Sequence, residues 1–210
     1  EHFIILSLSL FKLFIIRSTY IKEIMNERAK VILDFWFIET PSKLWFTKDL
    51  KFDKKIKKFF YIDYQQASKN KLDKWIKNPR ETLALILLLD QFSRNLYRKD
   101  KRAFENDAKA RLILKKAKKR NYLENYTFTE VHFMILPLMH SEDINDHDLW
   151  KNLSEKYLKK HPSFKEIKKY ADRHKYIIER FKRYPHRNKL IKRKSTNEEI
   201  NFLKEPMSSF

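Results

Sequence analysis

The 210-residue sequence contains no glycine and no cysteine. Without glycine it has no Gly-rich phosphate loop, no dinucleotide-binding fingerprint and no nucleophile elbow of the usual type. Without cysteine it has neither a disulfide framework nor thiolate chemistry, which leaves the redox compartment open, with a lean toward the cytoplasm. Helix ends and tight turns must use Asn, Lys or Pro instead. An all-α chain tolerates these absences best, and abundant Lys, Ile, Asn and Phe are typical of an AT-rich genome.

Acidic residues are also scarce, since 27 Asp and Glu stand against 47 Lys and Arg, for a net charge of +20. The lysines are spread over helical segments, which favours a solvated basic surface over a specific nucleic-acid site. Weak, salt-sensitive polyanion binding is still expected. A hydrophobic content of 42% argues against disorder, and the length fits one domain.

Residues 1–24 form an apolar N-terminal extension that differs from the rest of the chain. Its apolar part, residues 3–16, is shorter than the roughly 20 residues needed to cross a bilayer. Glu1 and His2 precede it instead of a basic segment, and no small-residue cleavage site follows. We therefore expect residues 1–24 to lie outside the fold, residues 25–210 to form a single all-α domain, and the protein to be cytoplasmic without an integral membrane span. A membrane anchor is the alternative for residues 1–24.

Helical periodicity extends through the chain from Met25, and no segment has the pattern of a strand. Local signals mark four helix starts: Asn26, Asn78-Pro79, and the capping boxes that begin at Thr127 and Thr196. Pro137 is expected to stop one helix. The expected helices cover residues 29–38, 52–68, 79–97, 101–120, 127–136, 144–160, 163–183 and 196–203. Short loops between them predict antiparallel stacked helix pairs.

Arginine is sparse but clustered, since seven of the 13 arginines fall within residues 90–98 and 173–193. Its planar fork of donors suits bidentate contact with carboxylate or phosphate. In the second window, His174 lies on an apolar stripe and is expected to be buried. The helix is expected to end before Pro185, which would place His186, Arg187 and Asn188 on a loop that can meet a ligand.

Two more constellations carry polar side chains next to apolar helices. Asp90 and Arg94 are an i,i+4 pair at the end of a Leu-rich helix, and His140 and Glu142 lie at a helix–loop junction. Each can be part of a polar pocket, or of an ion-paired network and helix caps. The alternative for the clustered arginines is pairing with Asp90, Glu142 or Glu179. The ligand-binding candidates are Asp90, Arg94, His140, Glu142, Arg180, Arg183, His186, Arg187 and Asn188.

The spacing of these residues matches no strong metal motif, and no cofactor is expected. No combination of nucleophile, base and orienting residue is visible, so the sequence leaves open whether the protein is an enzyme.

The sequence resembles the bacterial family of unknown function numbered 924 over about residues 29–205. The resemblance implies an α-α superhelix similar to tetratricopeptide folds. The family usually has Gly where Lys99, Lys182 and Lys192 stand, and Pro where Ser93 stands. The matching segments are residues 32–37, 45–46, 52–53, 72–75, 79–80, 89–98, 103–104, 140–143, 173–188 and 193–196.

Three functions are consistent with these features. The first is a pocket of His, Arg and Glu side chains that binds a small anionic metabolite. The second is a protein-interaction scaffold that uses a concave groove. The third is weak RNA binding through the basic surface.

Overall fold

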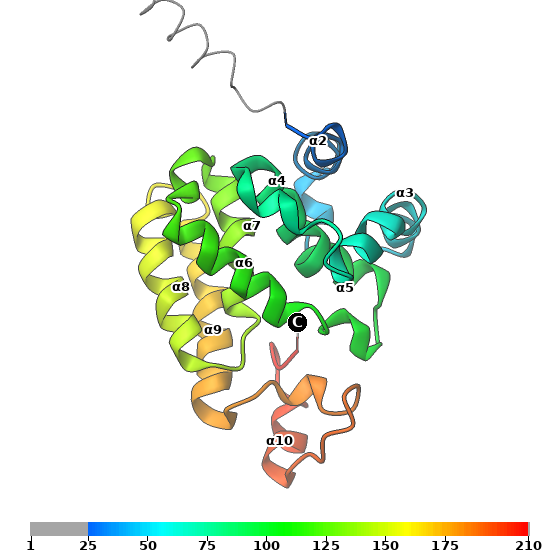
Figure 1. Ribbon diagram of the computed structural model, residues 1–210. Helices are drawn as coiled ribbons and strands as arrows, with labels where there is room; N and C mark the ends of the chain where they lie inside the picture. Colours follow the sequence, from blue (N-terminus) through cyan, green and yellow to red (C-terminus); the bar gives the residue numbers. More distant parts are fainter. Residues whose placement is uncertain (1–24, 210) are drawn as a thin grey trace, which may run out of the picture.

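The computed structural model describes residues 25–209, and these residues are all-α, with no strand among them (Figure 1). The expectations for residues 1–24 fall outside the described part. The α-helices are α2 (Glu27–Asp34), α3 (Leu50–Ser68), α4 (Pro79–Ile86), α5 (Ser93–Leu96), α6 (Asp107–Lys119), α7 (Phe128–Met139), α8 (Ile144–Tyr157), α9 (Phe164–Phe181) and α10 (Asn197–Phe202). Two π-helical turns, η1 (Phe35–Glu39) and η4 (Leu87–Phe92), follow α2 and α4. Short 3₁₀ turns cover Ser42–Leu44, Asp73–Lys77, Lys101–Ala103, Tyr122–Asn125 and Pro185–Arg187.

The helix starts are confirmed where side-chain capping specifies them. Asn26 and Asn78 accept hydrogen bonds from backbone N–H groups of the first turns of α2 and α4. Thr127 and Thr196 form complete capping boxes with the glutamates three residues later. These contacts are local in sequence and satisfy donors that a helix start otherwise leaves unpaired, so the sequence alone predicts them.

Pro137 does not end its helix, contrary to the sequence prediction. It lies inside α7, which continues to Met139. A proline removes one backbone hydrogen bond and crowds the preceding turn. The seven consecutive buried residues from Phe133 to Met139 hold α7 in the core, and this packing outweighs the local disruption.

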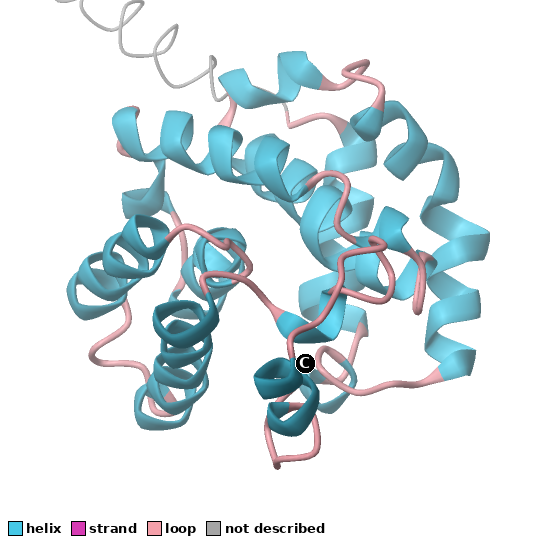
Figure 2. Cartoon of the chain, turned by 90° about the horizontal axis from the view of Figure 1, so that it is seen from below, coloured by secondary structure: helices cyan, strands magenta, loops and turns pink. Residues whose placement is uncertain are grey.

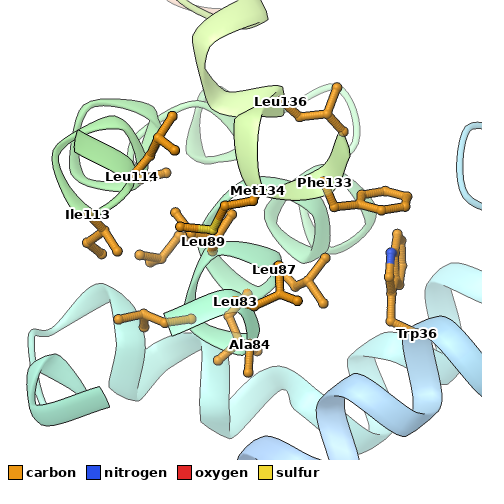
Figure 3. Close-up of a cluster of buried hydrophobic side chains, with 14 of the residues drawn as sticks. Trp36, Leu83, Ala84, Leu87, Leu89, Ile113, Leu114, Phe133, Met134 and Leu136 are labelled. Carbon is orange, nitrogen blue, oxygen red and sulfur yellow. The ribbon is translucent and has the colours of Figure 1, made fainter. Parts of the chain in front are cut away.

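The core surrounds the continuous helix formed by α4, η4 and α5. Every residue of η4 is buried, including Asp90 and Gln91. Figure 3 shows Leu83, Leu87 and Leu89 of this helix packed between Trp36 and the α7 residues Phe133 and Met134. The apolar helix thus lies at the centre of the fold, as its composition predicts. The π-helical turn η4 places the carboxylate of Asp90 inside that core.

Neighbouring helices pack as sequential pairs. Helix α7 lies against α8, and α8 against α9, while α2 and α3 cover the other side of the α4–α5 helix (Figure 1). Residues 182–209 follow α9 and contain α10, which lies at the lower end of the molecule in Figure 1, the end that faces the viewer in Figure 2. A small second cluster of Ile177, Ile178, Tyr184 and Phe202 attaches this C-terminal segment. A tetratricopeptide-like superhelical repeat of these pairs stays a prediction.

Six described residues adopt the left-handed backbone conformation that glycine usually adopts. None of the six is glycine, because the sequence contains none. Lys99, Lys182 and Lys192 have φ values of 60°, 57° and 59°. These are the three positions at which the resemblance implies glycine. Asn70, Asn121 and Met207 are the others. The absence of glycine therefore imposes backbone strain at defined turns.

Replacing Lys182 with glycine is expected to raise the free energy of unfolding by roughly 1 kcal/mol, because relief of the left-handed strain exceeds the entropy cost of glycine. The matched control is Lys169→Gly in the middle of α9, which is expected to lower the free energy of unfolding by about 0.5–1 kcal/mol. Urea denaturation at constant pH measures both. Equal effects of the same sign would contradict the strain assigned to Lys182.

Candidate functional site

A pocket of about 460 Å³ lies where several parts of the chain meet. The central helix supplies Gln91, Arg94, Asn95 and Arg98 to its wall. The loop at residues 45–48 and the C-terminal segment close other sides. This volume falls in the range of small-molecule sites.

Two further walls are helix faces whose residues recur at helical spacing. On α7 they are His132, Leu136, Met139 and His140. On α9 they are Glu166, Ile167, Tyr170 and His174. Residues three to four apart share a face, so each helix presents an imidazole-bearing stripe to the pocket. With His186, four of the seven histidines in the sequence line this one cavity.

Asp90 orients His140 from beneath the pocket. Asp90 is 0% exposed, and its Oδ1 lies 2.7 Å from His140 Nδ1, while Gln91 Nε2 donates to its Oδ2 at 2.6 Å. Burial alone would raise the pKa of Asp90, but His140, Arg94 and Gln91 outweigh it and hold the pKa below its ordinary value. An ionised Asp90 accepts a hydrogen bond, so Nδ1 of His140 carries the proton and Nε2 keeps its lone pair.

Arg94 and Arg187 share one carboxylate. Asp107 Oδ1 accepts from Arg94 Nη2 at 2.8 Å, and its Oδ2 accepts from Arg187 Nη1 at 3.2 Å. Arg94 also lies 3.7 Å from Asp90, which confirms their predicted i,i+4 proximity. One buried and one half-buried guanidinium and two buried carboxylates therefore balance beside the pocket.

Arg187 is the most deeply buried of the pocket cations, at 8% exposure. Its guanidinium lies over the rings of Phe104 and Tyr184, at 4.5 and 4.6 Å from their centres. Its Nε has no hydrogen-bond partner among the described residues. Burial, together with the nearby charge of Arg94, lowers the pKa of Arg187 despite the attraction of Asp107. The side chain thus retains unused capacity to bind an anion.

Burial keeps three of the pocket imidazoles neutral. It lowers the pKa of His132 to about 4, and that of His174 to about 3 although His174 Nδ1 donates to the Tyr170 carbonyl at 2.7 Å. Burial, together with Arg187 and Arg94, lowers the pKa of His186 to about 3. A bound anion would raise all three values, because it stabilises the charged imidazolium.

The predicted ligand-binding residues divide into two groups. Arg94, His140, His186 and Arg187 line the pocket, and Asp90 lies directly behind His140. The other four lie outside the lining and attach the C-terminal segment. They are Glu142, Arg180, Arg183 and Asn188.

Ion pairs and hydrogen bonds account for the positions of these four residues. Glu142 accepts from Arg193 at 2.6 and 2.8 Å and from the backbone N–H of Tyr184 at 2.8 Å. Arg180 donates to Glu198 at 2.9 Å at the surface. 

Glu199 is the second anchor of the same segment. Arg183 donates to it at 2.6 and 2.8 Å, and Asn188 at 3.2 Å. The partners of Arg180, Arg183 and Arg187 are thus Glu198, Glu199 and Asp107. Of the partners considered from sequence, Glu142 pairs with Arg193 and Asp90 lies near Arg94. The effect of these ion pairs is to hold His186 and Arg187 in the pocket wall.

Sequence reasoning missed the aromatic part of the lining, which includes Trp45, Phe46, Phe104 and Tyr170. Phe46 is 65% exposed although it lines the cavity. His132 was also missed, although its position eight residues before His140 on one apolar helix was a usable signal. The aromatic residues of the loop had no such signal, because their approach depends on tertiary packing.

No group of three or more His, Asp or Glu side chains among the described residues is placed to hold a metal ion. No helix in residues 25–209 has both the length and the apolar character that crossing a membrane requires.

Comparison with known proteins gives a family and one solved relative. Residues 32–207 match the model of a bacterial protein family of unknown function, DUF924. The chain is also similar to the solved structure of ATU0120, a protein of unknown function from Agrobacterium tumefaciens. The two are 32% identical, with a TM-score of 0.77, over 85% of this chain and 97% of the relative. No curated protein matches the sequence.

Proposed function

The chain belongs to the DUF924 family of bacterial proteins of unknown function, and from that premise we propose that it binds a small monoanion with an apolar or aromatic body. The observation that carries the proposal is Arg187, which is buried in the pocket wall with an Nε that no described group uses. A buried donor left without a partner costs free energy, and an anion in the pocket would remove that cost.

The charges of the pocket favour one negative charge over two. Arg94 and Arg187 are offset by Asp90 and Asp107, so the cavity has no large excess of positive charge while its histidines are neutral. A monoanion needs one compensating charge, which a single imidazole supplies when it takes up a proton.

The remaining lining favours a ligand with an apolar body. Trp45 and Phe46 come from the loop before α3, and Leu136, Met139 and Ile167 come from α7 and α9. Aromatic and aliphatic surfaces of this kind bind rings and short chains, while a few polar groups fix the orientation.

Diphenyl phosphate and benzoate are suitable probes, since each is a monoanion with an aromatic body, and benzamide is the uncharged counterpart of benzoate. Both anions are expected to raise the thermal midpoint of the protein at 0.15 M salt, where surface charges are screened. Arg187→Met is expected to weaken their binding roughly 10- to 100-fold, since it removes a charged hydrogen bond.

Arg180→Met is the matched control, because Arg180 pairs with Glu198 outside the pocket lining. It is expected to bind both probes as tightly as the unmodified protein does. Equal losses of affinity in the two variants would place anion binding on the general basic surface. Stabilisation by benzamide as strong as that by benzoate would contradict a role of the ligand's negative charge in binding.

A further inference from the structure

We propose that the pocket is catalytic, with His140 as a general base oriented by Asp90, and that its substrate is a phosphodiester monoanion. The proposal rests on the proposed anion binding and adds a reaction to it. The structural basis is the pair Asp90–His140, in which a fully buried carboxylate holds Nδ1 of an imidazole whose ring lines the cavity.

The Asp90–His140 contact fixes the tautomer that a base requires. Because Nδ1 donates to Asp90, the lone pair is on Nε2, and no hydrogen bond from the described residues occupies Nε2. A buried carboxylate also stabilises the imidazolium that forms when Nε2 accepts a proton. The π-helical turn η4 contributes to this arrangement by presenting Asp90 and Gln91 from an otherwise apolar helix, and such turns are frequent at functional sites.

Charged and titratable groups surround His140 from every wall of the pocket. The groups that interact electrostatically with His140 are Asp90, His132, His147, His174 and His186, and Arg94 and Arg187 line the same pocket. Two of these are guanidiniums able to face phosphoryl oxygens, where negative charge accumulates in the transition state.

A phosphodiester fits these features better than a monoester does. A diester carries one negative charge at neutral pH, which matches the near-balanced charges of Arg94, Arg187, Asp90 and Asp107. It also carries two organic groups, and the pocket offers aromatic rings from separate parts of the chain, Trp45 in the loop and Tyr170 in α9 among them.

The reaction is hydrolysis. Nε2 of His140 takes a proton from water, and the resulting hydroxide oxygen bonds to phosphorus. The bond between phosphorus and one ester oxygen breaks, and its electron pair leaves with that oxygen. The leaving oxygen then takes the proton from Nε2, so that one water and one diester give one monoester and one alcohol, and His140 returns to its neutral form.

The test uses bis(4-nitrophenyl) phosphate, whose hydrolysis releases coloured 4-nitrophenolate, with the full chain. His140→Gln is expected to lower kcat by about 10²- to 10⁴-fold. Asp90→Asn, a positioning variant, is expected to lower kcat with a much smaller change in KM. His161→Gln changes a histidine outside the pocket lining and is expected to leave kcat unchanged.

The pH profile, measured between about pH 5 and 8 and only where the protein remains folded, gives a readout that a purely structural role would not produce. For the unmodified protein, kcat/KM is expected to fall on the acid side of this range, because a general base must be unprotonated to accept a proton from water. The residual activity of His140→Gln is expected to lack that limb. A rate independent of pH over this range would overturn the role of His140, whether or not the variants fold.

The remaining outcomes separate catalysis from binding. If diphenyl phosphate stabilises the protein but bis(4-nitrophenyl) phosphate is hydrolysed no faster than in buffer, the catalytic proposal fails and anion binding stands. If neither effect occurs, both proposals fail. Hydrolysis that is equally fast in a folded His140→Gln variant would also overturn the assignment of the base.

Discussion

Replacing Asp107 with alanine is expected to lower the free energy of unfolding by about 3–5 kcal/mol, a large part of the stability of a typical domain. Asp107 is 5% exposed and is the carboxylate that Arg94 and Arg187 share. Its removal leaves the buried Arg187 and the half-buried Arg94 with too little negative charge, and an uncompensated buried charge costs more than the ion pair contributed.

A second substitution tests whether charge is the cause. In the background of Asp107→Ala, Arg187→Met removes one of the two guanidinium charges that Asp107 had paired, and it is expected to restore part of the lost stability. Asp148→Ala is the matched surface control, because Asp148 is exposed and pairs with Lys175. Urea denaturation at pH 7.5 measures all three variants. Similar small losses for Asp107→Ala and Asp148→Ala would contradict the account of the pocket charges.

Lowering the pH from 7.5 to 5 is expected to cost several kcal/mol of stability. His132, His174 and His186 have pKa values of about 4, 3 and 3 in the folded protein, compared with an ordinary value of 6.5. Above pH 6.5 each is neutral in both states and contributes nothing. Below pH 6.5 these histidines take up protons in the unfolded chain and stay neutral in the folded protein, so the free energy of unfolding falls. At pH 5 the loss is up to about 2 kcal/mol for each imidazole.

Two comparisons locate this pH dependence in the pocket. His132→Phe is expected to reduce the loss between pH 7.5 and 5, whereas His161→Gln is expected to retain most of it, because burial is the main cause of the low pKa of His132. Diphenyl phosphate is expected to stabilise the protein more at pH 5 than at pH 7.5, because an anion raises the pKa of the neighbouring imidazoles. A loss of stability that is the same in His132→Phe as in the unmodified protein would show that these histidines are not its source.

The sequence predicts the fold to the extent that local chemistry determines it. The caps at Asn26, Asn78, Thr127 and Thr196 depend on contacts within four residues, and the structure has all of them. The course of α7 through Pro137 was not predictable in this way, because it depends on core contacts from other helices.

The candidate site could be predicted in part. Asp90 and Arg94 are neighbours on one helix, and His140 and Arg187 carry chemistry that marks them in the sequence. Their meeting depends on α6, because Asp107, a residue with no motif of its own, joins Arg94 to Arg187.

The C-terminal segment shows a second reason why sequence reasoning fell short. Arg180 and Arg183 have the same chemistry as Arg187 and lie only a few residues away. They differ from it in the partners that the fold brings to them, since Glu198 and Glu199 follow in α10 and take up their charges. Composition therefore indicates where arginines gather, and tertiary structure decides which of them face the cavity.

The most direct test of anion binding in the pocket is a crystal structure of the protein with diphenyl phosphate. The phosphate is expected in the cavity, with one oxygen within hydrogen-bond distance of Arg187 Nε and the others near Arg94 and His140. Phosphate bound only to surface lysines, or a pocket left without the ligand at saturating concentration, would contradict this expectation.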